Sequence, residues 1–159
     1  MIRVERGDLV AARGDVALEL GDLLLEDVDA ALDVGLLARG VRLPPQFGLT
    51  GRQAESALLD AGVVTNRNSV PQDPNGAWYT TGVRFGTPAL TTRGFGHDEF
   101  DKVAELVVET LSNTTPKTTA AGAPSKATYQ LADGVAERVR AQSAEMLDKH
   151  QLYPGLELS

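Results

Sequence analysis

NRNSVPQDPNGAWYTTGVRFGTPALTTRGF, residues 66–95, is the stretch that decides the fold of this chain. It is dense in Gly, Pro and Asn, which shape the backbone into turns. Arg84 lies inside the apolar run Gly82–Gly86, and Arg93 follows nine residues later. Arg carries a permanent charge and a planar fork of donors that fits a carboxylate or phosphate. Because a buried charge is costly without an anion beside it, Arg84 is either in a structural ion pair with an internal Asp or Glu or binds an anionic substrate.

Local signals on both sides of this stretch predict alternating helices and strands. Thr50 and Gln53 form a capping box, which predicts a helix that begins there and ends at Gly62, where Gly can adopt the left-handed conformation. The apolar runs at 63–65 and 83–85 are predicted strands. Helices and strands in alternation indicate an α/β layered fold.

The second half of the chain is predicted to hold two helices joined by a linker. Residues 96–112 carry an apolar face at helical spacing and an acidic first turn, both typical of a helix. Residues 113–126, NTTPKTTAAGAPSK, are of low complexity and are predicted to be a flexible linker. Residues 127–159 are predicted to form a C-terminal helix, ending near residue 149, and a tail.

The first 47 residues form a separate segment that is predicted to be mostly helical. The alternation in residues 2–6 predicts a short strand. Residues 16–37 are rich in Leu, Ala, Asp and Glu with a helical rhythm, Gly40 is a predicted helix stop, and Pro44–Pro45 is a break.

Composition limits the classes of function. The 159 residues, 42% of them hydrophobic, suffice for one domain with a core. A net charge of −7 argues against nucleic acid as a partner, because nucleic acid selects basic faces. The absence of Cys and the presence of only two His argue against a metal site, and the lack of Cys fits the cytoplasm. No apolar run reaches the ~18 residues of a membrane span and no signal peptide is visible, so no membrane association is expected.

An ordered string of motifs in this region resembles a known family. NRNSVP at 66–71, then DP at 73–74, then TGVRFGTPALTTRGF at 81–95 are similar to the C-terminal small domain of serine hydroxymethyltransferase. The resemblance is clear from about Leu49 to Leu111 and extends to the tail near Leu152. A string of this length is much more specific than a short motif.

The resemblance implies a fold, a reaction and site residues. The family consists of enzymes dependent on pyridoxal phosphate that move a one-carbon unit between serine and glycine with tetrahydrofolate as co-substrate, and they form oligomers. Their small domain packs helices on one face of a small mixed or antiparallel sheet, which we expect for residues 48–112. By resemblance Arg84 binds the carboxylate of the amino acid, and Asn68 contacts folate. Arg93 lies in the motif as a supporting residue, whereas Asn68 could instead cap a local turn.

The chain departs from the family in its lysines. A pyridoxal-phosphate enzyme needs a desolvated lysine that forms a Schiff base with the cofactor. Lys102, Lys117, Lys126 and Lys149 are the four lysines, and each is predicted to be a solvated surface charge. The family's Ser/Thr-rich stretch ending in His-Lys and its Thr-Asp-Asn-His-like stretch are not found. We therefore expect no catalytic residue here and a separate large domain or chain that holds most of the cofactor.

Three hypotheses of function follow. The chain could be the substrate-clamping domain of a hydroxymethyltransferase, inactive alone, with an aldolase or transaldolase of β-hydroxy amino acids as a variant. It could be a non-catalytic module that binds an amino acid or folate and regulates a partner. It could also be an inactive truncated remnant. The missing lysine and the unfamiliar first 47 residues favour this hypothesis.

Overall fold

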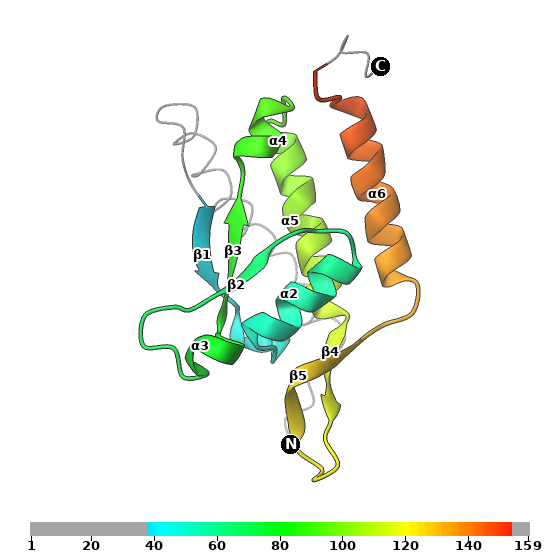
Figure 1. Cartoon of the computed structure of the whole chain (residues 1–159). Coiled ribbons are helices and arrows are strands. Elements are labelled where there is room, and N and C mark those ends of the chain that lie inside the picture. Colours follow the sequence, from blue (N-terminus) through cyan, green and yellow to red (C-terminus); the bar gives the residue numbers. More distant parts are fainter. Residues whose placement is uncertain (1–37, 154–159) are drawn as a thin grey trace, which may run out of the picture.

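The computed structural model describes residues 38–153 (Figure 1). The predicted strand at 2–6 and the predicted helix at 16–37 lie outside the described residues. In chain order the elements are β1 (Ala38–Arg42), the 3-10 turn η1 (Pro45–Phe47), α2 (Gly51–Asp60), β2 (Asn66–Asn68), α3 (Gly76–Tyr79), β3 (Gly82–Gly86), α4 (Pro88–Thr92), α5 (His97–Ser112), β4 (Thr114–Thr118), β5 (Pro124–Leu131) and α6 (Val135–Lys149).

Three of these strands form one small antiparallel sheet in the order β1-β3-β2. The central strand β3 therefore has both of its edges hydrogen-bonded, and Val83 lies opposite Val41 on one side and Arg67 on the other. A second antiparallel sheet consists of β4 and β5 alone. The predicted α/β fold with a small antiparallel sheet is confirmed.

Helices cover the face of the three-stranded sheet from which Val83 and Phe85 project. Both side chains join the main core cluster with Leu58 of α2 and with Phe100 and Val107 of α5. Figure 1 shows α5 and α6 running side by side, and a second, smaller cluster fills the space between them. Burial of apolar side chains on one face leaves the other face of the sheet free for polar residues.

The capping box predicted at the start of α2 is present. The Thr50 hydroxyl accepts from the Gln53 backbone N–H, and the Gln53 side chain accepts from the Thr50 backbone N–H. The helix closes at Gly62, whose φ is +84°. The predicted strand at 63–65 is wrong, because the Val63 N–H turns back to the Leu58 carbonyl to complete the helix cap, so pairing begins only at β2.

Residues 113–126, predicted as a flexible linker, instead form most of a β-hairpin. Thr114 lies opposite Leu131, and the turn passes through Gly122 with φ of +82°. The linker prediction failed because this hairpin is fixed by a distant helix. The buried Gln53 donates from Nε2 to the carbonyl oxygen of Ser125 over 2.8 Å.

Two further boundaries differ from the prediction. α5 is confirmed at its expected place, but α6 begins at Val135 and not at residue 127, because 127–131 continue β5. Gly134, with φ of +76°, then turns the chain into the helix. Gly40 is not a helix stop, since it pairs with Arg84 inside β1.

Candidate functional site

The candidate site lies on the face of the sheet that the helices leave open. Side chains alternate along β3, so Val83 and Phe85 are buried while Arg84 between them is exposed. The predicted cost of burying this charge therefore does not arise. Within residues 38–153 the Arg84 side chain has no hydrogen bond or ion pair, and the structural ion pair with an internal carboxylate is not found there.

The strand register shows what surrounds Arg84. Gly40 of β1 and Asn66 of β2 lie directly opposite it, and both are exposed. Residues directly opposite in an antiparallel pair project to the same face. Gly86, two residues further along β3, carries no side chain, whereas the space over Gly40 is occupied by the Asn68 side chain.

Asn68 shares this face with Arg84. It pairs with Gly82, two residues before Arg84 on the same strand. A Cβ built on Gly40 would lie 3.0 Å from Asn68 Cγ, so the amide extends over the sheet toward β1. Asn68 Nδ2 donates to the Ser69 carbonyl over 2.9 Å, which is the local turn contact expected if Asn68 only shapes the backbone. The structure thus brings the two predicted residues together on one face.

Asp73 holds the loop that joins these two residues. Its carboxylate accepts hydrogen bonds from the backbone N–H groups of Val70, Asn75 and Thr81 and from the Thr81 hydroxyl. Partial desolvation raises the pKa of Asp73, but the four hydrogen bonds lower it by more. The result is a pKa of about 2, below the ordinary value of 3.8. The ionised carboxylate therefore fixes the loop between β2 and β3 at neutral pH.

Arg93 does not join the site. Its Nε donates to the His150 carbonyl and its Nη2 to the Leu147 carbonyl, both over 2.8 Å. Since these carbonyls end α6, Arg93 caps that helix and ties it to the segment after α4.

The sequence reasoning missed Arg42, which pairs with Gly82 and therefore projects to the same face as Arg84. It is exposed, and its Nη2 donates to the Pro71 carbonyl over 3.1 Å. The alternation in ARGVR at 38–42 was the available signal, but the expected helix stop at Gly40 concealed it.

The residues of the described part do not fit the Schiff base of pyridoxal phosphate. All four lysines are exposed, and they lie on α5, β4, β5 and at the end of α6, away from the face that carries Arg84. Lys149 pairs with Glu145, and Lys126 lies 6.0 Å from the Tyr79 ring. Across residues 38–153 no group of three or more His, Asp or Glu side chains could hold a metal ion, and no helix is long and apolar enough to cross a bilayer.

The arrangement can bind a small anion. A guanidinium offers parallel N–H donors that fit a carboxylate, and an adjacent amide adds one donor and one acceptor. Such a pair of side chains is suited to holding and orienting a ligand.

Comparison with known proteins agrees with the motifs. The sequence model of the serine hydroxymethyltransferase family matches residues 39–107. The match begins ten residues earlier than the resemblance at Leu49, so β1 belongs to it although its sequence looked unfamiliar.

Curated relatives give the same family. The serine hydroxymethyltransferase of Cutibacterium acnes is 60% identical over 143 residues, which cover 81% of this chain and 29% of the relative. That of Mycolicibacterium smegmatis is 71% identical over 112 residues, 70% of this chain and 22% of the relative. That of Treponema pallidum is 49% identical over 111 residues. The chain thus spans less than a third of the length of these relatives, and it belongs to the serine hydroxymethyltransferase family.

Proposed function

We propose that this chain is the C-terminal, substrate-clamping small domain of a serine hydroxymethyltransferase-like enzyme. In this role Arg84 binds the carboxylate of serine or glycine. The observation that carries the proposal is an exposed guanidinium on the central strand, without a partner within residues 38–153, inside the segment that the family model matches. An ionised side chain with free donors on an open face is suited to a carboxylate ligand.

Asn68 is proposed to contact tetrahydrofolate beside the amino acid. Its amide lies over Gly40, whose lack of a side chain makes room for that amide on the face of Arg84. The loop held by Asp73 follows Asn68 directly, so it supports the position of the amide. Arg93 supports the site only indirectly, by attaching α6.

Pyridoxal phosphate is proposed to be held mainly by a large domain or a second chain, in a homo- or hetero-oligomer in the cytoplasm. None of the four exposed lysines fits the Schiff base, so no chemical step is derived for this chain. The role of the described residues is to fix the carboxylate and thereby the orientation of the amino acid, which lowers the entropic cost of the reaction.

A chimera tests the role of Arg84. Residues 38–153, which include β1, would replace the corresponding segment of the Mycolicibacterium smegmatis enzyme, which is 71% identical over 112 residues. We expect Arg84→Gln to raise the KM for serine roughly 100-fold, because a charged, two-point hydrogen bond to the carboxylate is worth about 3 kcal/mol. Arg67→Gln is the matched control, since Arg67 pairs with Glu55 on the helix-covered face. An unchanged KM in the Arg84 variant would refute the clamp.

The exposed lysines favour one second candidate, a module that binds an amino acid without chemistry. Titration of the isolated chain with glycine, with glycinamide as the matched ligand that lacks the carboxylate, separates the two. If the chain binds glycine at micromolar concentration but does not bind glycinamide, the result supports the non-catalytic binding module. An aldolase or transaldolase would use the same Arg84 clamp, and the chimera assayed with a β-hydroxy amino acid distinguishes it.

A further inference from the structure

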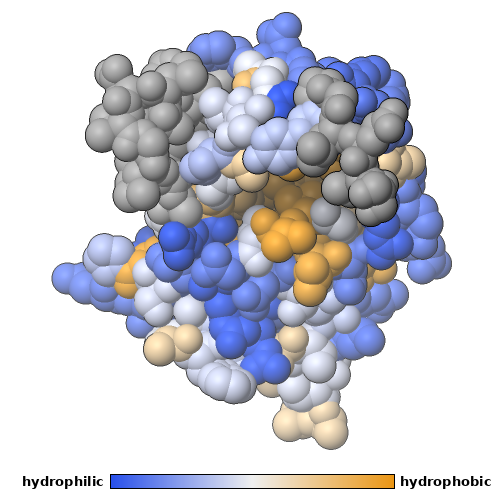
Figure 2. Space-filling view, turned by 45° about the horizontal axis from the view of Figure 1, so that its top comes forward, coloured by the Kyte–Doolittle hydropathy of each residue, from blue (hydrophilic) through white to orange (hydrophobic). Residues whose placement is uncertain are grey.

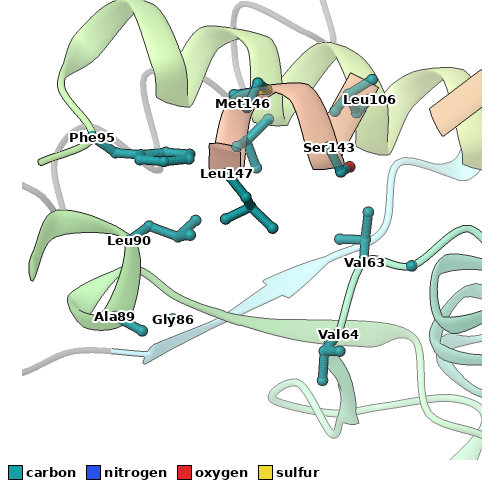
Figure 3. Close-up of a pocket in the computed structure, with 12 residues that line it drawn as sticks. Val63, Val64, Gly86, Ala89, Leu90, Phe95, Leu106, Ser143, Met146 and Leu147 are labelled. Atoms are coloured by element: carbon teal, nitrogen blue, oxygen red, sulfur yellow. The ribbon is translucent and has the colours of Figure 1, made fainter. Parts of the chain in front are cut away.

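One hollow of the described fold is apolar. A pocket of about 310 Å³ opens between α4, α5 and α6, and Figure 3 shows Leu90, Leu147 and Val63 around it. Figure 2 shows hydrophobic surface gathered around a hollow near the middle of the visible face. Ser143 is the one lining residue with a hydroxyl or charged group, so the pocket offers few polar groups that could orient a specific ligand. Charged and aromatic side chains gather instead around α3.

Trp78 on α3 is the only Trp of the chain, and 61% of it is exposed. Two guanidinium groups lie over its ring. The Cζ atom of Arg52, on α2, is 5.1 Å from the ring centroid, and the Cζ atom of Arg67, on β2, is 5.5 Å from it. Cation–π contacts of this kind stabilise the position of the indole. Arg67 also pairs with Glu55 over 2.9 Å, so its charge is already balanced within the fold.

A second cation–aromatic contact lies next to the first. Tyr79 follows Trp78 on α3, and the Nζ atom of Lys126 is 6.0 Å from the centroid of the Tyr79 ring. The Lys126 carbonyl accepts a hydrogen bond from the Thr50 hydroxyl over 2.8 Å, and Thr50 caps α2 two residues before Arg52. Both cations therefore lie at the same end of α2. We call Arg52, Trp78, Tyr79 and Lys126 the cation–aromatic surface.

The cation–aromatic surface is positive although the chain as a whole is acidic. Within residues 38–153 neither Arg52 nor Lys126 forms an ion pair, whereas the chain carries a net charge of −7. Exposed Trp, Tyr and Arg are the residue types that dominate the binding energy of protein–protein interfaces. Because electrostatic potentials across an interface are complementary, a surface of this charge selects a partner that presents carboxylates.

A protein segment fits this surface better than a nucleic acid does. The bases of a single strand bind by stacking on aromatic rings, but guanidinium groups already occupy positions over the Trp78 ring. Two cations would also neutralise few phosphates, and a net charge of −7 repels a polyanion. An Asp or Glu side chain needs only one cation, and an apolar neighbour can pack against the exposed indole.

We propose that the cation–aromatic surface is a docking site for an acidic segment of a partner protein. Arg52 and Lys126 bind two carboxylates of that segment, and Trp78 packs against an apolar side chain between them. This site is independent of the proposed substrate clamp. Arg67, which supports the indole, lies opposite the strand position just before Arg84 and therefore projects to the other face of the sheet.

Tryptophan fluorescence tests this proposal in the full chain, because the single Trp lies within the surface. The probe is a short blocked peptide of Glu with one Leu at its centre, and the matched peptide has Gln in place of Glu. At low ionic strength we expect the Glu peptide to shift the emission of Trp78 to shorter wavelength until the change saturates. The Gln peptide should bind roughly tenfold more weakly. No shift with the Glu peptide, or equal binding of the two peptides, would overturn the proposal.

Two double variants separate this surface from the net charge of the chain. Arg52→Gln combined with Lys126→Gln should weaken binding of the Glu peptide roughly tenfold. Arg138→Gln combined with Lys149→Gln removes the same charge from α6, which lies away from α3 in Figure 1, and should leave binding unchanged. Equal weakening in both variants would show that only net charge matters and would overturn the proposal. Tighter binding of a short oligothymidylate than of the Glu peptide would also overturn it, since the surface would then recognise nucleic acid.

Discussion

Arg93 holds the end of α6 through Leu147, whose carbonyl accepts a 2.8 Å hydrogen bond from the guanidinium 54 residues earlier in the sequence. The His150 carbonyl accepts a second one, and the His150 ring packs on Phe95, two residues after Arg93. One side chain from a motif that resembles a substrate site thus connects two helices.

Arg93→Ala should destabilise the chain by about 2 kcal/mol, because two charge-assisted hydrogen bonds to the last carbonyls of α6 are lost. Urea unfolding measures the change, and hydrogen exchange should place the loss of protection in residues 140–150. Arg138→Ala is the matched control, since the Arg138–Glu109 pair is exposed and contributes less than about 1 kcal/mol. Equal losses of unfolding free energy in the two variants would contradict the proposal that Arg93 caps α6.

Gln53→Leu should detach the hairpin from α2. The buried amide donates to the carbonyls of Ser125 and Thr128, and Leu would leave both without a donor and break the capping box. We expect a loss of about 2–4 kcal/mol. Thermal unfolding followed by far-UV circular dichroism measures the stability, and amide exchange of β5 measures the detachment. Protection of Thr128 equal to that in the wild type would show that the hairpin stands without Gln53.

Asp73 should make the chain sensitive to acid. Its folded pKa of about 2 lies below the ordinary value of 3.8, so its contribution to stability is complete above pH 3.8 and is lost as the pH falls toward 2. The difference in unfolding free energy between the wild type and Asp73→Asn should therefore shrink between pH 5 and about pH 2.

Because Glu99 also titrates in acid, the effect of Asp73 is measured as the difference in unfolding free energy between the wild type and Asp73→Asn. The Gly96 N–H lowers the pKa of Glu99, so the wild type and the Asp73 variant share a second acidic transition. A constant difference between the two chains across the range would contradict the role of Asp73, and NMR titration of its side-chain carbon measures the pKa directly.

Gly82→Ala and Gly40→Ala should separate stability from site geometry. A Cβ on Gly82 would lie 2.8 Å from the backbone oxygens of Asn68 and Val41, so the strands must part, at a cost of about 2 kcal/mol or more. A Cβ on Gly40 meets only the Asn68 side chain, which can turn away. We therefore expect near-native stability but shifted Asn68 side-chain amide resonances in Gly40→Ala. Similar destabilisation by both changes would contradict this geometry.

The sequence by itself determined the elements whose signals lie within a few residues. The capping box of Thr50 and Gln53 and the apolar face of α5 both depend on neighbouring positions, whereas the exposure of Arg84 on β3 appeared only in the structure. The family motifs also lie in this continuous region, so the order of residues along the chain is enough to propose Arg84 and Asn68 as candidate site residues.

Only the tertiary structure decided the relationships between distant residues. The hairpin at 114–131 depends on a buried amide more than 70 residues away, and Arg93 finds its partners at the other end of the chain. Pairing of β1 with β3 places Gly40 beneath Asn68 and Arg42 on the face of Arg84. Local composition cannot encode such contacts, because their free energy appears only when the separate segments pack against one another and exclude water.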